Sequence, residues 1–128
     1  MFKLCFSGHM VFIDFLDWDL FYYEMHIPLP CSTMAFAFGW FQKGKTIIAS
    51  TAPKGKEVEV TCYASACLIL SFTEEFLEPA VRYLTAATEI LGDYPFSRID
   101  LILLPRCFAC MGLARLVFVS DCRCKNEL

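Results

Sequence analysis

The chain is poor in charged residues. Only 20% of its 128 residues are Asp, Glu, Lys or Arg, against about 25% in a typical soluble domain. Hydrophobic residues make up 57% of the sequence, and a single small domain has too little polar surface to separate all of them from water. We therefore expect an exposed apolar face at which the chain self-associates or binds another protein. The net charge is −3 and no basic stripe is present, which argues against a nucleic-acid partner.

Long uninterrupted apolar runs are also missing. A membrane-spanning helix needs about 20 mostly apolar residues, and the best candidate, Leu101 to Val119, is interrupted by Pro105, Arg106 and Arg115. The N-terminal apolar run is broken at residues 7–9 and has no small-residue cleavage site of the secretory kind. The sequence thus predicts no membrane association and a cytoplasmic location.

Histidine is scarce, with only His9 and His26 in the chain. Neither begins an HExxH motif, in which two imidazoles hold zinc and the glutamate activates water. Both are interpreted as surface or loop histidines. We expect no catalytic residue and no metal ligand from them.

Cysteine, by contrast, is frequent, with eight residues. Without a secretory signal this favours a reducing compartment and free thiols. Cys62 and Cys67 lie in apolar stretches and are predicted to be small core residues. The pairs in Cys107-Phe108-Ala109-Cys110 and Cys122-Arg123-Cys124 could supply four thiolates to zinc, so a Cys-based zinc module is a rival interpretation. The CxC spacing is unlike a zinc knuckle, and CxxC lacks the strand-to-helix setting of a redox motif.

The hydrophobic pattern predicts an α+β fold. An aromatic N-terminal part, in which Asp17, Asp19 and Glu24 alternate with aromatics, suggests strands. Further strands are predicted at Met34–Phe41 (buried), Thr46–Ser50 (inside a Lys/Gly/Pro loop at 43–57), Val58–Tyr63, Cys67–Phe72, Ile99–Leu104 and Leu116–Val119.

A helix is predicted over Glu78–Leu91. Pro79 suits its first turn and Gly92 its end. Helical spacing would bury one face, formed by Val81, Leu84, Ala87 or Thr88, and Leu91.

This helix and the strand after it resemble a known family. Pro79–Gly92 followed by Asp93–Pro105, with its segment Tyr94-Pro-Phe-Ser-Arg-Ile-Asp100, is similar to the start of the catalytic domain in M1 (gluzincin) aminopeptidases. The variant of this segment, and the continuation from Pro105 to Ala114, resemble the aminopeptidase O branch. Upstream, the segment from Ile27 to Gly39 looks like the end of the family's N-terminal β-domain.

The resemblance implies a thermolysin-like catalytic domain, zinc as cofactor and a parent activity that removes N-terminal residues from peptides. It also shows what this chain lacks. Neither HExxH nor the amine-gripping glutamate of the family's GAMEN strand is present, and no carboxylate occurs between Pro105 and Ser120. We expect an incomplete piece of such a peptidase, cut before the zinc helix and inactive by itself. No catalytic or metal-binding residue is carried over, and the substrate-binding residues are unknown.

The resulting domain assignment has three parts. Residues 1–57 are assigned to the end of the β-domain, 58–120 to the start of the catalytic domain and 121–128 to a divergent tail. The last four residues, Lys125 to Leu128, look like the retrieval signal KDEL, which we interpret as coincidence because no secretory signal is present. The alternative function is a non-catalytic interaction module with an exposed apolar face.

Asp100 is the carboxylate of most interest, because it lies inside an apolar strand. If buried it must be paired, with Arg98, Arg106 or a backbone cap as partner. A structural role is favoured over a catalytic one. Tyr63, Tyr83 and Tyr94 are predicted to be core residues in preference to pocket residues.

Overall fold

The computed structural model describes residues 3–6, 9–15, 18–24, 27–51, 55–104, 111–113 and 115–120, with side chains from residue 27 onward. The predicted α+β class is confirmed. The helix is α1 (Ile69–Leu91), and η1 (Cys31–Thr33) is a short 3₁₀ turn. No helix in the described ranges is long and apolar enough to cross a membrane.

The main sheet has five strands in the order β5-β6-β7-β9-β8. Their bounds are Gln42–Thr51 for β5, Lys56–Ala64 for β6, Arg98–Leu104 for β7, Met111–Leu113 for β8 and Leu116–Ser120 for β9. β6, β7 and β9 run parallel, while the edge strands β5 and β8 are antiparallel to their neighbours. The predicted strands at 58–63, 99–104 and 116–119 are therefore confirmed.

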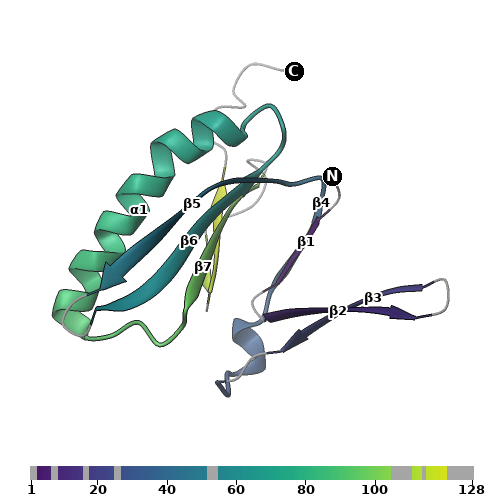
Figure 1. The fold of residues 1–128 in the computed structure, drawn as a ribbon, viewed down its shortest axis with the longest axis horizontal. Helices are drawn as coiled ribbons and strands as arrows, with labels where there is room; N and C mark the ends of the chain where they lie inside the picture. The colour runs from purple at the N-terminus through teal and green to yellow at the C-terminus, as the bar shows by residue number, and fades with distance from the viewer. Residues whose placement is uncertain are drawn as a thin grey trace.

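Two strand pairs accompany this sheet. β1 (Lys3–Phe6) pairs antiparallel with β4 (Phe36–Gly39), and β2 (His9–Phe15) pairs antiparallel with β3 (Trp18–Glu24). Figure 1 shows both pairs to the side of the main sheet that lies away from α1. The strands expected in the aromatic N-terminal part are present.

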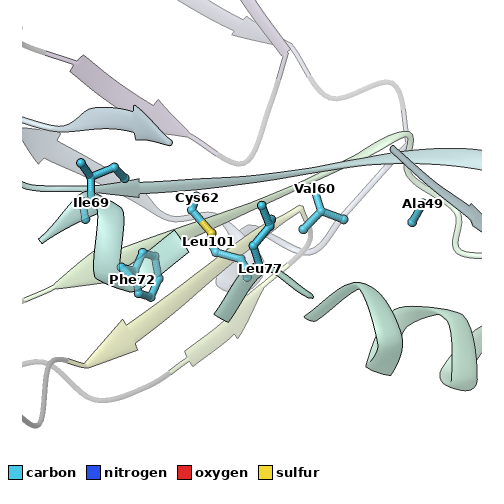
Figure 2. Packing of buried hydrophobic residues seen from close by; sticks show 8 residues of the cluster. Ala49, Val60, Cys62, Ile69, Phe72, Leu77 and Leu101 are labelled. Atoms are coloured by element: carbon cyan, nitrogen blue, oxygen red, sulfur yellow. The ribbon is translucent and has the colours of Figure 1, made fainter. Parts of the chain in front are cut away.

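α1 connects the parallel strands β6 and β7 and covers one face of the sheet, over β5 and β6 (Figure 1). Two neighbouring parallel strands need such a crossover, because a tight turn reverses the chain direction and would make the strands antiparallel. The buried side chains between helix and sheet form the main core: Ala49, Val60, Cys62, Ala64, Ile69, Phe72, Leu77 and Leu101. Figure 2 shows Leu77 of α1 among Cys62 and Val60 of β6 and Leu101 of β7 in this core.

The second face of the sheet is partly covered as well. Tyr63, Ile102 and Leu116 are buried there, with Ala37 of β4 in the same cluster and Phe41 packed against it. The segment before β5 therefore acts as a second layer over β6, β7 and β9.

The predicted N-terminus of the helix is wrong. Cys67–Phe72 is not a strand: α1 starts at Ile69, and Pro79 lies inside it. A short apolar run does not distinguish a strand from a buried stretch of helix. An interior proline costs about 3 kcal/mol or more, but burial of Phe72 and Leu77 against the sheet outweighs that cost.

The predicted C-terminus of the helix is correct. Gly92 has φ +91°, and its N–H donates to the carbonyl oxygen of Thr88 at 3.1 Å. The predicted face is correct for Val81, Leu84 and Thr88 but wrong for Leu91, which is 85% exposed. The last turn of α1 lies beyond the part of the sheet on which the preceding turns pack.

Two strand predictions need correction. Met34–Phe41 is not a buried strand, because β4 is shorter and Phe36, Phe38 and Trp40 are each at least 65% exposed. The 43–57 loop with a short internal strand is instead a hairpin of β5 and β6, whose register shifts between Lys43 and Thr46. The predicted domain boundary at 57/58 falls within β6 and stays a prediction.

Gly44 lies in that shifted part of β5, where α1 approaches the strand closely. A Cβ at this position would lie 2.3 Å from Oγ1 of Thr73 and 3.1 Å from a terminal carbon of Ile69. A residue without a side chain is needed here for the first turns of α1 to pack on the sheet.

Candidate functional site

A buried polar cluster lies on the face of the sheet opposite α1, and its centre is Asp100. Arg98 and Asp100 are two residues apart on β7, so their side chains leave the same face. Nε of Arg98 donates to Oδ1 of Asp100 at 2.8 Å, and Nη2 of Arg98 donates to the hydroxyl oxygen of Tyr63 at 2.9 Å. The side chain of Asp100 is 9% exposed and that of Arg98 33% exposed. The prediction that a buried Asp100 must be paired is confirmed, with Arg98 as its partner.

The backbone also joins this cluster. The N–H of Asp100 donates to the carbonyl oxygen of Arg115 at 2.7 Å, just before β9 begins. Arg115 has φ +65°, an uncommon conformation for a side-chain-bearing residue. The cluster therefore connects β6, β7 and the turn into β9.

The electrostatics match a structural ion pair. Burial lowers the pKa of Arg98, but the hydrogen bond and charge of Asp100 outweigh it, with help from Tyr63 and Glu59, so the pKa lies above its ordinary value. Burial and the charge of Arg98 lower the pKa of Arg115, against the attraction of Asp100 and Tyr94. Burial raises the pKa of Tyr94. The carboxylate of Asp100 is thus paired with the guanidinium of Arg98, and the described residues of the cluster place no general base beside a nucleophile.

The three tyrosines predicted to be core residues differ in burial, and one of them, Tyr63, belongs to this cluster. Tyr63 is buried, as expected, whereas Tyr94 is half-buried and Tyr83 is 76% exposed, so Tyr83 is not a core residue. Several predicted positions lie outside the described residues: the side chain of His9, the whole of His26 and Arg106, and the cysteine pairs Cys107/Cys110 and Cys122/Cys124.

The cysteines whose side chains are described are Cys31, Cys62 and Cys67, and all three are free thiols. Cys62 is fully buried in the core, as predicted, and burial raises its pKa to about 11. A thiol with so high a pKa is a poor nucleophile and a poor metal ligand. Cys67 is exposed in the turn before α1, contrary to the core position predicted for it, and its Sγ lies 3.4 Å from Oγ of Ser65.

The zinc site of the M1 type does not fit the residues present. Within the described ranges no three His, Cys, Asp or Glu side chains come together as a metal site. The strand after Pro105, where the resemblance puts the amine-gripping glutamate, is β8, with the sequence Met-Gly-Leu.

Sequence reasoning missed Tyr63 and Arg115 as members of the cluster. The Arg-x-Asp spacing within a strand is a signal for the Arg98–Asp100 pair. No sequence signal leads to Tyr63, because it comes from β6, 35 residues before Arg98.

Known proteins resemble this chain in sequence and in fold. No family model matches the chain. The sequence is 27% identical over 104 residues to aminopeptidase B from mouse and from human, which covers 80% of this chain and 14% of either relative. The M1 zinc metallopeptidase of Deinococcus radiodurans superposes with a TM-score of 0.74 at 17% identity over 93% of this chain and 27% of that protein. Yeast LTA4 hydrolase gives 0.64 at 19% identity, over 93% of this chain and 17% of that protein.

The chain therefore spans a small part of the relatives it matches. The similarities confirm the M1-type relationship predicted from the sequence. The finer likeness to aminopeptidase O stays a prediction.

Proposed function

We propose that this chain, a relative of the M1 zinc metallopeptidases, corresponds to the β-strand and crossover-helix core with which the catalytic domain of such a peptidase begins, and that it is not catalytic by itself. The observation that supports this most is the mixed sheet with the β6–α1–β7 crossover, in a chain without HExxH. Zinc and the removal of N-terminal residues from peptides would belong to a complete peptidase. The proposed domain division assigns residues 1–57 to the end of the β-domain, 58–120 to the start of the catalytic domain and 121–128 to a divergent tail.

The described residues support the lack of catalysis in physical terms. The carboxylate of Asp100 forms an ion pair with Arg98, and Cys62 is buried as a protonated thiol. Peptide hydrolysis needs a water activated by a metal or a base, and these groups supply neither.

The test is an aminopeptidase assay. Purified chain, with zinc supplied, is incubated with aminoacyl-amide substrates beside an M1 zinc metallopeptidase as positive control. We expect no turnover above background and no stoichiometric zinc. The matched control is the double variant His9→Ala/His26→Ala, which removes both imidazoles of the chain. Chelator-sensitive turnover that disappears in this variant would overturn the proposal.

The proposed location is a reducing, cytoplasmic compartment, supported by the free state of the three described cysteines. The proposed partners are proteins and peptides, since the net charge of −3 does not favour nucleic acid.

A second candidate is an interaction module that uses exposed apolar surface, including self-association. It is favoured by the large apolar side chains that are at least half exposed: Met34, Phe36, Phe38, Trp40, Ile48, Leu70, Tyr83, Ile90, Leu91 and Met111. Light scattering and binding of an apolar dye such as ANS test this candidate. A sharp monomer peak without dye binding would contradict it.

A further inference from the structure

β5 is an open edge of the main sheet. It pairs with β6 on one side, and no described residue pairs with its other side. Its two lysines, Lys43 and Lys45, lie in the irregular part at its start, and the regular part, Thr46–Thr51, contains no charge, proline or glycine. An unprotected edge of this composition favours pairing with a further strand. Ile48, inside this segment, is 64% exposed.

One flank of α1 lies on the same side as this open edge. The side chains of Ile69 and Thr73 approach Gly44 of β5. Leu77, by contrast, lies among residues of β6 and β7 (Figure 2). Successive residues advance about 100° around a helix, so the direction from Leu77 through Thr73 to Ile69 leads outward across β5. The next large side chains in this direction are those of Phe76, Tyr83 and Ile90.

This flank is apolar although it is exposed. Phe76, Tyr83 and Ile90 are 38%, 76% and 83% exposed. The residues between them on the helix surface are also uncharged: Pro79, Ala80, Ala86 and Ala87. The opposite flank, on the side of β7, carries polar side chains: Glu74, Glu78 and Thr85. A flank exposed to water is normally polar. The open edge of β5 and the apolar flank of α1 therefore form one continuous surface for a partner.

We propose that this surface binds a second copy of the chain about a two-fold axis that is perpendicular to the sheet and passes at Ile48. The inference rests on the self-association proposed above and names its surface. β5 then pairs antiparallel with the partner's β5, and the sheet continues from one copy into the other. Ile48 packs beside the partner's Ile48, and Thr46 lies opposite the partner's Ser50. Lys45 lies opposite the partner's Thr51, so no like charges meet along the strands.

The spacing of sheets and helices explains why a copy fits both parts of the surface. Neighbouring strands are about 4.8 Å apart, and α1 lies over β5 and β6. A helix centred between these strands lies about one strand spacing from the two-fold axis, so the two α1 axes are about 10 Å apart. Packed helices have interaxial distances of about 8–10 Å. An extended peptide would pair with the strand edge only and leave the flank of α1 exposed, which favours a copy.

Sedimentation equilibrium over a concentration series tests the surface, with circular dichroism to show that each variant keeps its fold. We expect a reversible dimer for the natural chain. Ile48→Lys places two lysines side by side at the axis and should weaken the dimer about tenfold or more. The matched control is Met111→Lys on β8, the other edge of the sheet, where the residue is 50% exposed. Tyr83→Ser/Ile90→Ser should also weaken the dimer, whereas Leu70→Ser, at a 78% exposed residue outside the flank, should not.

The outcomes separate the parts of this inference. A monomeric natural chain would overturn it together with self-association. A dimer unchanged by Ile48→Lys would overturn the pairing of β5, and one unchanged by Tyr83→Ser/Ile90→Ser would overturn the contact between the helices. None of these results bears on the lack of catalysis, which the aminopeptidase assay measures.

Disulfide formation tests the strand register. Directly opposite residues of antiparallel strands have Cα atoms about 4.5–5.5 Å apart, which a disulfide can span. Mild oxidation of Ile48→Cys should therefore link position 48 of the two copies, identified by mass spectrometry of the digested chain. Ser50→Cys is the control, because the two positions 50 would be about 13 Å apart. A dimer that links through position 50 and not through position 48 would overturn the proposed register.

Discussion

Arg98 and Asp100 form a hydrogen-bonded ion pair on one face of β7, with Nε of Arg98 2.8 Å from Oδ1 of Asp100. The same guanidinium donates to Tyr63, so one side chain joins two parallel strands. The pair and Tyr63 thus connect β6 and β7 on the face of the sheet opposite α1.

Removing the charge of Asp100 should therefore destabilise the chain. Asp100→Asn leaves Arg98 without its counter-charge, and partial exposure of Arg98 moderates the effect, so we expect a loss of about 1–3 kcal/mol in the free energy of unfolding. Urea denaturation measures it. Glu89→Gln on the exposed side of α1 is the control, with an expected change within about 0.5 kcal/mol. Equal tolerance of the two changes would show that the ion pair contributes nothing.

Two leucines of α1 distinguish its buried side from its exposed end. Leu77 is 1% exposed and Leu91 is 85% exposed. Leu77→Ala should lower the free energy of unfolding by about 2–5 kcal/mol, because it removes buried methyl groups and leaves a cavity. Leu91→Ala removes the same atoms from solvent-exposed surface and should change it by less than about 0.5 kcal/mol. Thermal and urea melts that rank the two variants alike would mean that the helix register is different.

The close approach at Gly44 gives a coupled pair. Gly44→Ala should destabilise the chain by about 1–3 kcal/mol, because the added Cβ overlaps with Thr73 and displaces α1. Thr73→Ala removes Oγ1, which is buried without a hydrogen-bond partner among the described residues. The double variant should lose less than Gly44→Ala alone. Gly112→Ala is the control, since an added Cβ there meets nothing within 4 Å. Additive losses in the double-mutant cycle would contradict the proposed overlap.

Stability should fall above pH 9 because of Cys62. Burial raises the pKa of this thiol from 9.0 to about 11 in the folded state. Between these values the unfolded chain has released the proton and the folded chain still holds it, so rising pH favours unfolding. The full effect is about 1–3 kcal/mol. It is absent below pH 9 and grows as the pH approaches 11.

Urea denaturation across this pH range measures the slope. Cys62→Ala should flatten it, whereas Cys67→Ala, at an exposed thiol, should not. Burial also raises the pKa of Tyr94, and Tyr94→Phe separates that contribution to the same decline. An unchanged slope in Cys62→Ala would assign the decline to other groups.

The sequence alone was enough for the features that depend on local chemistry. Alternation located β6, because successive side chains of a strand point to opposite faces, and apolar runs located β7 and β9, because a strand between two neighbours with cover on both faces is apolar on both. Gly92 marked the end of α1, because only glycine adopts its positive φ at no cost. The order of the helix and the Tyr94–Asp100 segment also carried the M1 resemblance, which the comparisons confirm.

Other features were decided by tertiary contacts. Pro79 predicted the start of the helix, yet packing of Ile69, Phe72 and Leu77 on the sheet extends α1 by more than two turns before it. The preference of proline for the first turn of a helix contributes less free energy than the burial of three large side chains. The partner of Asp100 was open among Arg98, Arg106 and a cap, and the geometry of β7 selected Arg98 with Tyr63 of β6. Leu91 follows the helical period of the core face but is exposed, because burial depends on where the sheet surface ends and a repeating pattern carries no information about that limit.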